Sequence, residues 1–154
     1  MSATRIVGSS SVRVDGLAKA TGAAQYVDDL DFGPGLLHAA VVESTHAHAK
    51  LKKVDVSAAE KAPGVVRVVT GKDFPYKFGL YMQDRYIFAQ DRVRFVGEQI
   101  AAVVAETPEA ALRAAKLVRV DYEPLPLVLS LGDALKPDAV VLHPDLGSYQ
   151  KVPW

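Results

Sequence analysis

The sequence predicts an α+β fold with a mixed β-sheet, one β–α–β unit and several short helices. Three observations support this expectation. Apolar, β-branched runs of strand length recur along the chain, notably at residues 36–44, 65–70 and 99–105. A helical segment with a stripe of small apolar residues follows the last of these runs, and a further strand-like run follows the helix. Glycine and proline separate the elements, which is typical of a folded domain with turns between its strands.

The first 30 residues are expected to form an extended arm with turns and without a helix. Gly8, Gly16 and Gly22 lie among polar residues there, and no helical or strand period is present. The triplet Gly33-Pro34-Gly35 then marks the entry into the first strand.

The first half of the domain is predicted to hold three strands and one short helix. The run at 36–44 predicts a largely buried strand, and the alternation in 51–56 predicts a half-exposed one. Ser57 and Glu60 have the spacing of a capping box at the start of a short helix. Residues 65–70 form the third strand, because β-branched side chains favour that conformation.

The second half has the stronger signals. Residues 99–105 predict a buried central strand, and Thr107 followed by Pro108 predicts the start of a helix. Small apolar side chains recur along this helix at i, i+3, i+4 and i+7, which allows close packing against a sheet (Ala111, Ala114, Ala115 and Val118). The run at 117–122 predicts a strand parallel to 99–105, joined by a right-handed crossover. Ser130 is expected to cap one last short helix.

Composition narrows the classes of protein. The chain has 154 residues, 49% of them hydrophobic and 23% charged, which is typical of one globular domain. Lys+Arg and Asp+Glu are 18 each, so a basic surface for nucleic acid is not indicated. No secretory signal or run long enough to span a bilayer is visible, so a soluble, cytoplasmic protein without membrane insertion is expected.

Chemistry-bearing motifs are weak. The chain has no cysteine, which removes thiolate nucleophiles and cysteine-ligated metal centres from consideration within it. His46-Ala47-His48 resembles half of a metal site, but a turn with partly exposed rings is the favoured interpretation because further ligands are missing nearby. His38 is expected to be a core histidine. The acidic pairs at 28–29 and at 84 and 91 are expected to be ionised surface groups. We therefore assign no catalytic, cofactor-binding or metal-ligating residue from the sequence.

Several stretches in order resemble the large subunits of the molybdenum hydroxylases, the xanthine dehydrogenase and aldehyde oxidase family. Among these stretches are Arg13-Val14-Asp15-Gly16, Lys19-Ala20-Thr21-Gly22, Ala47-His48-Ala49, Pro63-Gly64-Val65, Val96-Gly97, 101–105 and 120–126. The resemblance extends over about residues 5–146. It is specific because the stretches occur in the same order as in the family. It implies the N-terminal α/β hammerhead domain of such a subunit.

On this resemblance, residues 1–30 form the N-terminal arm, 31–136 the hammerhead domain and 137–154 a tail leading toward a molybdenum-binding region. Molybdopterin, iron–sulfur clusters and FAD are implied in the full complex, with none bound by this chain alone. The implied partners are the remaining molybdenum-binding portion, an iron–sulfur subunit and an FAD subunit in an oligomeric complex. Glu98 follows Gly97 in a way that is similar to the family's catalytic glycine–glutamate pair, but its position before the buried strand fits the hammerhead instead.

The implied reaction of the complete enzyme is hydroxylation or oxidation of an aldehyde, a purine or another aromatic compound, with water as the oxygen source. A reductive branch of the family also exists. The chain itself is expected to supply structure and interface. Its aromatic segment at 76–88 is expected to pack the domain or its interface, and the alternative is that it lies against neighbouring domains or lines a substrate passage. The alternative is a free-standing hammerhead module that binds or scaffolds without enzymatic activity.

Overall fold

The computed structural model describes residues 8, 10–80 and 83–146 of the chain. By internal contacts the chain forms two units, Met1–Pro34 and Gly35–Trp154. The first unit contains a short helix α1 (Gly16–Ala20) and a 3-10 turn η1 (Val27–Asp29), so the expectation of an arm without a helix is wrong. Helix α1 has only five residues, too few to give a period, and it is stabilised locally by the Lys19–Asp15 ion pair at 2.7 Å.

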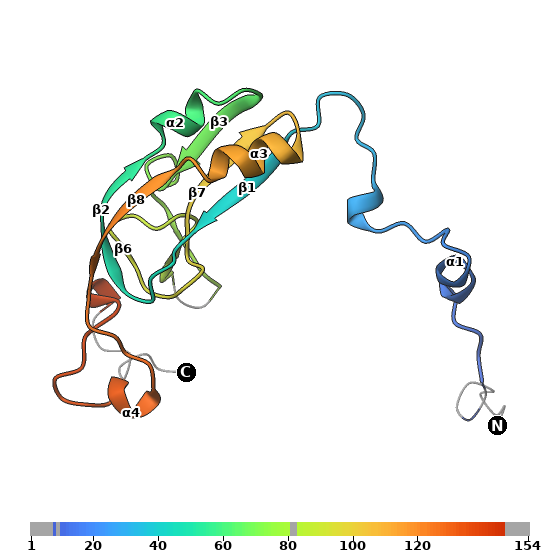
Figure 1. The fold of residues 1–154 in the computed structure, drawn as a ribbon. Coiled ribbons are helices and arrows are strands. Elements are labelled where there is room, and N and C mark those ends of the chain that lie inside the picture. The colour runs from blue at the N-terminus through green and yellow to red at the C-terminus, as the bar shows by residue number, and fades with distance from the viewer. Residues whose placement is uncertain (1–7, 9, 81–82, 147–154) are drawn as a thin grey trace. The chain divides into compact units, whose positions relative to one another are not determined.

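The second unit is built from small antiparallel sheets (Figure 1). The first, sheet A, has the strand order β1 (His38–Glu43), β7 (Gln99–Ala105) and β3 (Val65–Thr70). The second, sheet B, has the order β6 (Arg92–Val93), β2 (Ala49–Asp55) and β8 (Arg119–Pro124). A two-stranded hairpin joins β4 (Lys77–Phe78) to β5 (Arg85–Tyr86) inside the long aromatic connection. The α+β class predicted from the sequence is confirmed.

The expected parallel pairing across the β–α–β segment is wrong. Strand β7 already has a neighbour on each side, since it pairs antiparallel with both β1 and β3. Strand β8 instead pairs antiparallel with β2 in sheet B. The chain order strand–helix–strand is therefore present, but the helix connects two different sheets.

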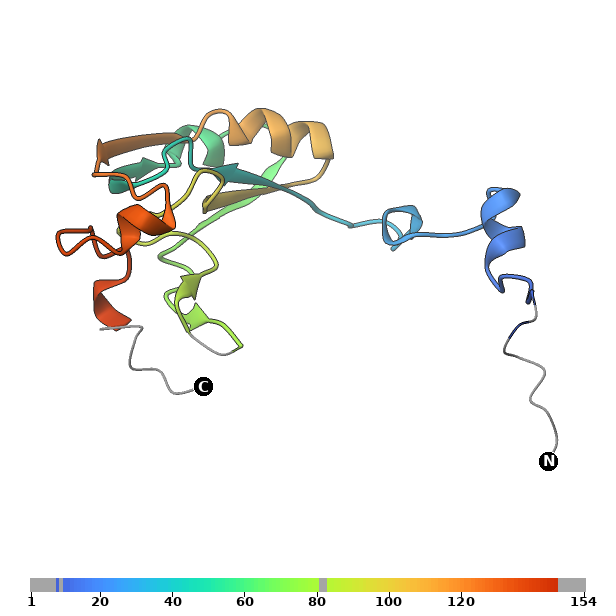
Figure 2. The same cartoon turned by 90° about the horizontal axis from the view of Figure 1, so that it is seen from below.

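Helix α3 (Pro108–Ala115) covers one face of sheet A, as Figure 2 shows. Thr107 caps it as predicted, accepting a hydrogen bond from the Ala110 amide at 3.1 Å, and Pro108 occupies the first turn. Ala110, Ala111 and Ala114 are buried against β1, β3 and β7. Small side chains allow this close approach, so the predicted packing stripe is confirmed in its main part.

Strand β7 contributes side chains to two cores. Val103 and Ala105 face α3 and contact the clusters around Ala114 and Ala111. Ile100, on the opposite side of the pleat, packs with Ala49, Ala89 and Val93 in the core beneath sheet B. The prediction of a buried central strand is confirmed. By contrast β1 lies at the edge of sheet A and only Ala40 in it is buried, so the largely buried strand expected there is wrong.

The two short helices α2 and α4 have different hydrogen bonds at their N-termini. Helix α2 (Ser57–Glu60) lacks the predicted capping box, because the Asp55 carboxylate accepts from both the amide and the hydroxyl of Ser57, at 3.1 and 2.6 Å. Helix α4 (Leu131–Ala134) has the predicted cap, with the Ser130 hydroxyl accepting from the Asp133 amide at 3.0 Å. A 3-10 turn η2 (Pro144–Leu146) follows. Within the described ranges, every helix falls short of the length and apolar character needed to cross a membrane.

Candidate functional site

The four histidines lie in different surroundings. The His46 ring stacks on Tyr122 with centroids 4.2 Å apart, and His48 is only 3% exposed. His38 is half-buried at the start of β1, so the expected core position is wrong for it. In the part of the chain that the structure describes, no group of three or more histidine or acidic side chains is placed to hold a metal ion.

His48 holds the chain segment that follows β8. Its ring Nδ1 lies 2.7 Å from the Pro126 carbonyl oxygen, and its own carbonyl accepts from the Leu125 amide at 3.0 Å. These two hydrogen bonds fasten 125–126 to the start of β2. The partly exposed ring expected for His48 is therefore wrong. The partners lie far along the sequence, so the local His-Ala-His pattern carries no signal for this role.

A small pocket of about 220 Å³ adjoins His48. Its wall also includes Arg94 and Leu142, and its remaining lining is apolar (Ala47, Phe95, Val96, Leu127, Val128 and Leu129). The Nε2 atom of His48 is buried and has no hydrogen-bond partner among the described residues. An unpaired polar atom of this kind is rare in folded proteins, because desolvation without a hydrogen bond is unfavourable.

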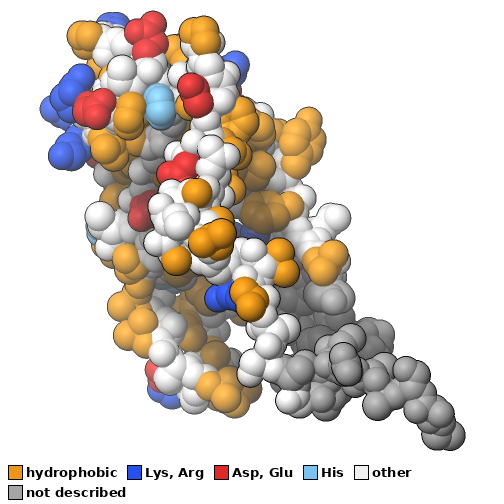
Figure 3. Space-filling model, turned by 90° about the vertical axis from the view of Figure 1, so that its right-hand side faces the viewer, with side chains coloured by type: hydrophobic (Ala, Val, Ile, Leu, Met, Phe, Trp, Pro, Cys, Tyr) orange, Lys and Arg blue, Asp and Glu red, His pale blue; other side chains and the backbone are white. Residues whose placement is uncertain are grey.

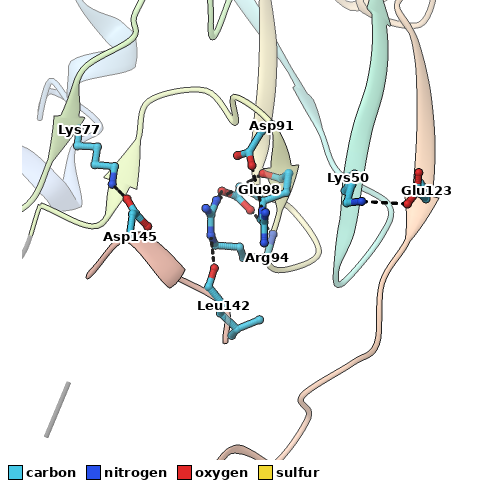
Figure 4. Close-up of polar contacts among 9 residues, drawn as sticks. Lys50, Lys77, Asp91, Arg94, Glu98, Glu123, Leu142 and Asp145 are labelled. Atoms are coloured by element: carbon cyan, nitrogen blue, oxygen red, sulfur yellow. Dashed lines mark hydrogen bonds and ion pairs between the residues drawn. The ribbon is translucent and has the colours of Figure 1, made fainter. Parts of the chain in front are cut away.

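Arg94, which lines this pocket, forms a polar network with Glu98 (Figure 4). The Glu98 carboxylate accepts from the Arg94 amide and lies 3.8 Å from its guanidinium. Arg94 Nε donates to the Leu142 carbonyl at 3.0 Å. Both side chains are about nine-tenths buried. The network therefore fixes the turn before β7 and attaches the segment around Leu142 to it.

Burial raises the pKa of Glu98 above its ordinary value, although the Arg94 amide and charge oppose that rise. Burial also lowers the pKa of His143, and the nearby positive charge of Arg94 acts in the same direction. A buried carboxyl with a raised pKa is found in many active sites. Here the carboxylate accepts from the backbone amide of Arg94 and forms an ion pair with its guanidinium, which indicates a structural role for Glu98.

A larger groove of about 530 Å³ lies between β2, α2 and β3. Its charged residues partly neutralise each other, since Arg67 binds Asp73 at 3.0 Å. Gln90, also in its lining, donates to the carbonyls of Gly71, Phe74 and Phe88. The side chains of Arg67, Asp73 and Gln90 thus stabilise the connection between β3 and β6.

The aromatic connection is partly packed and partly exposed. Phe88 is buried and its ring lies 6.0 Å from that of Phe74, whereas Tyr76 is 75% exposed. Lys77 ties the hairpin to η2 through an ion pair with Asp145 (Figure 4). Other large hydrophobic side chains are also exposed on the second unit, among them Phe78, Leu80, Phe95, Val96, Leu127 and Leu129. Figure 3 shows hydrophobic side chains, in orange, distributed over one face of the protein. Tyr81 lies outside the described residues.

Comparison with known proteins identifies the class. Residues 21–126 match the family model described as aldehyde oxidase and xanthine dehydrogenase, a/b hammerhead domain. The chain belongs to this family of molybdenum oxidoreductases and contains its hammerhead domain. The resemblance inferred from the ordered sequence stretches is confirmed.

Individual relatives agree. The chain is 45% identical over 138 residues to a probable xanthine dehydrogenase component of Bacillus subtilis, covering 88% of this chain and 18% of the relative. It is 37% identical to the carbon monoxide dehydrogenase large chain of Afipia carboxidovorans, covering 91% and 18%. A solved Cu,Mo-CO dehydrogenase superposes with a TM-score of 0.85 at 36% identity, covering 92% of this chain and 18% of that one. The chain thus spans less than a fifth of these relatives.

Proposed function

We propose that this domain is a structural and interface component of a molybdenum-dependent hydroxylase or dehydrogenase whose catalytic residues lie outside the 154 residues. One observation carries the proposal. A hammerhead domain that spans less than a fifth of its relatives has large hydrophobic side chains exposed over several elements. Exposed apolar surface of this kind is typical of contacts with other parts of an assembly.

The donor atoms of the chain do not fit the family's metal groups. Iron–sulfur clusters are held mainly by cysteine thiolates, and the sequence has no cysteine. The described residues also bring no set of three metal-ligating side chains together. We therefore propose that molybdopterin, the clusters and FAD are bound by the remaining large-subunit portion, an iron–sulfur subunit and an FAD subunit.

The proposed reaction of the assembly is oxidation of an aldehyde, a purine or another aromatic substrate, with oxygen supplied by water. Names of relatives support this range, since they include xanthine dehydrogenases and an aldehyde oxidase. We further propose that the assembly does not bind nucleic acid, because the chain carries equal numbers of basic and acidic side chains. A cytoplasmic location is proposed from the sequence analysis.

Native mass spectrometry of the tagged chain, purified from its own host, tests the proposal. The expected result is a complex that contains molybdenum and several further subunits besides this chain of 16.5 kDa. A lone species of 16.5 kDa without metal would overturn it and support the free-standing module. Metal analysis of the same preparation by plasma mass spectrometry separates a molybdenum enzyme from an unrelated assembly.

A further inference from the structure

Strand β1 leaves an unprotected edge on sheet A. It pairs with β7 on one side, and in the described part of the chain no strand pairs with its other side (Figure 1). Native proteins usually protect such an edge with charged side chains or a β-bulge, because its free amides and carbonyls can pair with another chain. Strand β3 has a bulge at Val66 next to the charged Arg67, and β8 carries three charged side chains (Arg119, Asp121 and Glu123). Strand β1 carries one acidic residue, Glu43, and neither lysine nor arginine, and the irregularity in its pairing adds the extra residue to β7.

The outward backbone groups of β1 follow from the contact at its end. The Ser44 amide donates to the Glu98 carbonyl, and the Ser44 carbonyl accepts from the Gly97 amide, each at 2.8 Å, so both backbone groups of Ser44 point toward the β7 side. Inward and outward groups alternate along an antiparallel strand. The residues that direct their amides and carbonyls to the open edge are therefore Ala39, Val41 and Glu43.

This edge is complementary to a second copy of itself. A two-fold axis perpendicular to the sheet at Val41 sets Val41 opposite Val41 of the second copy, and Ala39 opposite Glu43. Each facing pair then exchanges two backbone hydrogen bonds. The Val41 side chain is 44% exposed, and two β-branched side chains directly opposite each other stabilise a sheet. The two Glu43 carboxylates lie at opposite ends of the strand pair, so like charges do not meet.

Helix α3 has room beside its own copy in this arrangement. It packs on β1 and β7 through Ala40 and Ala105, so its axis lies over the space between these two strands. Neighbouring strands lie about 4.8 Å apart, which places the axes of the two α3 helices about 10 Å apart across the two-fold axis. Packed helices have interaxial distances of about 8–10 Å, so the two helices lie in contact rather than in collision.

The flank of α3 that faces the second copy carries an exposed apolar side chain. The opposite flank lies against residues 62–63, on the side of α2 and β3 (Ala110, Arg113 and Leu117). With about 3.6 residues per turn, Leu112 therefore lies on the side toward the β1 edge, and it is 59% exposed. Glu109 and Lys116 lie one turn before and after Leu112, and in the described part of the chain neither forms an ion pair. In an antiparallel helix pair centred on Leu112, each Glu109 comes opposite Lys116 of the other copy.

We propose that two copies of this chain associate through the outer edges of β1, with Val41 at the two-fold axis and the two α3 helices side by side. Sheet A then continues as one antiparallel sheet from copy to copy. A two-fold interface uses the same surface twice, which is what a self-complementary edge supplies. The proposal is independent of the proposed function, since a free-standing module and a molybdenum-containing assembly with two copies of the chain can both hold this contact.

Sedimentation velocity of the purified 154-residue chain tests the association. A species of twice 16.5 kDa is expected at about 100 μM protein. Val41→Lys places two like charges at the axis and should raise the dissociation constant of the dimer about tenfold or more. Val66→Lys is the matched control, because Val66 is 54% exposed on β3 at the opposite edge of sheet A, and it should associate as the wild type does. A monomeric wild type, or equal dissociation constants for the two variants, would overturn the proposal.

A single introduced cysteine tests the register, because the chain has no cysteine of its own. In Val41→Cys the two thiols of a dimer lie on facing residues, whose Cα atoms are about 5.5 Å apart in a hydrogen-bonded pair. This separation allows a disulfide. Mild oxidation should give a covalent dimer about fivefold faster or more for Val41→Cys than for Val66→Cys, and equal rates would contradict the position of the axis. This small substitution also keeps the proposal testable if circular dichroism shows that Val41→Lys does not fold.

Exchange of the charges on α3 tests the helix contact. Glu109→Lys and Lys116→Glu should each raise the dissociation constant of the dimer about threefold, because each sets like charges opposite each other. The chain with both substitutions should recover most of the wild-type value, since the pairs are restored with their signs exchanged. Equal dissociation constants for all four chains would overturn the placement of the two α3 helices side by side.

Discussion

Replacing Ile100 with alanine is expected to weaken the contact between the two main sheets. Ile100 is 1% exposed, its backbone belongs to sheet A, and its side chain packs with Ala49, Ala89 and Val93 beneath sheet B. Alanine removes about three carbon groups at roughly 0.8 kcal/mol each. The unfilled cavity adds to this loss, so the total should be about 3–4 kcal/mol, within the range of about 2–5 kcal/mol for such changes.

Urea denaturation of the 154-residue chain, followed by circular dichroism, measures this loss. Ile100→Val, which removes one carbon, should cost about 1 kcal/mol. Val41→Ala is the matched control, because Val41 lies on the edge strand β1 and is 44% exposed. It should cost well under half of the Ile100→Ala effect. Equal losses for Ile100→Ala and Val41→Ala would refute the assignment of Ile100 to the core between the sheets.

Three further changes test other features. Glu98→Gln tests the raised pKa of Glu98. A carboxyl whose pKa is higher in the folded state stabilises the protein at low pH, and this stabilisation is lost as the pH rises through the folded-state pKa, so in urea titrations the wild type should gain stability relative to the variant as the pH falls from 7 toward 4. A change in the opposite direction would contradict this expectation. Thr107→Ala removes the cap of α3 and should cost about 1 kcal/mol by thermal unfolding, with Thr107→Ser near wild type. Gly71→Ala places a Cβ 2.7 Å from the Ala89 carbonyl oxygen and should lower the free energy of unfolding by roughly 1–3 kcal/mol. Gly132→Ala is the control, because its Cβ would lie 3.7 Å from the nearest atom and the change should be nearly neutral. Similar losses for the two variants would refute the steric argument.

Local signals in the sequence predicted local structure well. Thr107 and Pro108 specify the start of α3, and Ser130 specifies the start of α4, because each acts on amides three residues away or fewer. The apolar run of β7 likewise predicted a central strand. The pairing of strands was not predictable in this way. A strand after a helix is most often parallel to the one before it, but here β8 finds its partner in β2.

The contacts at the candidate site could not be predicted from the sequence. The role of His48 depends on Pro126, and Arg94 depends on Leu142, so neither can be found from neighbouring residues. Asp55 shows the same limit at short range, since it displaced Ser57 as the capping group of α2 by binding both its amide and its hydroxyl. The family, in contrast, was predictable from the order of many weak stretches. Order along the chain survives even where each side chain's contacts are set by the tertiary structure.

The central position of β7 has a consequence for how the domain forms during synthesis. His38 and Val65 both pair with Ala105, and Asp55 pairs with Arg119, so sheets A and B each join early strands to a late one. Contacts of such high sequence separation slow folding, since the intervening loop must close first. The early strands therefore wait without their partners until β7 and β8 have left the ribosome. During that interval the edges of β1, β2 and β3 are open to wrong pairing, and the nascent chain depends on rapid completion of its second half.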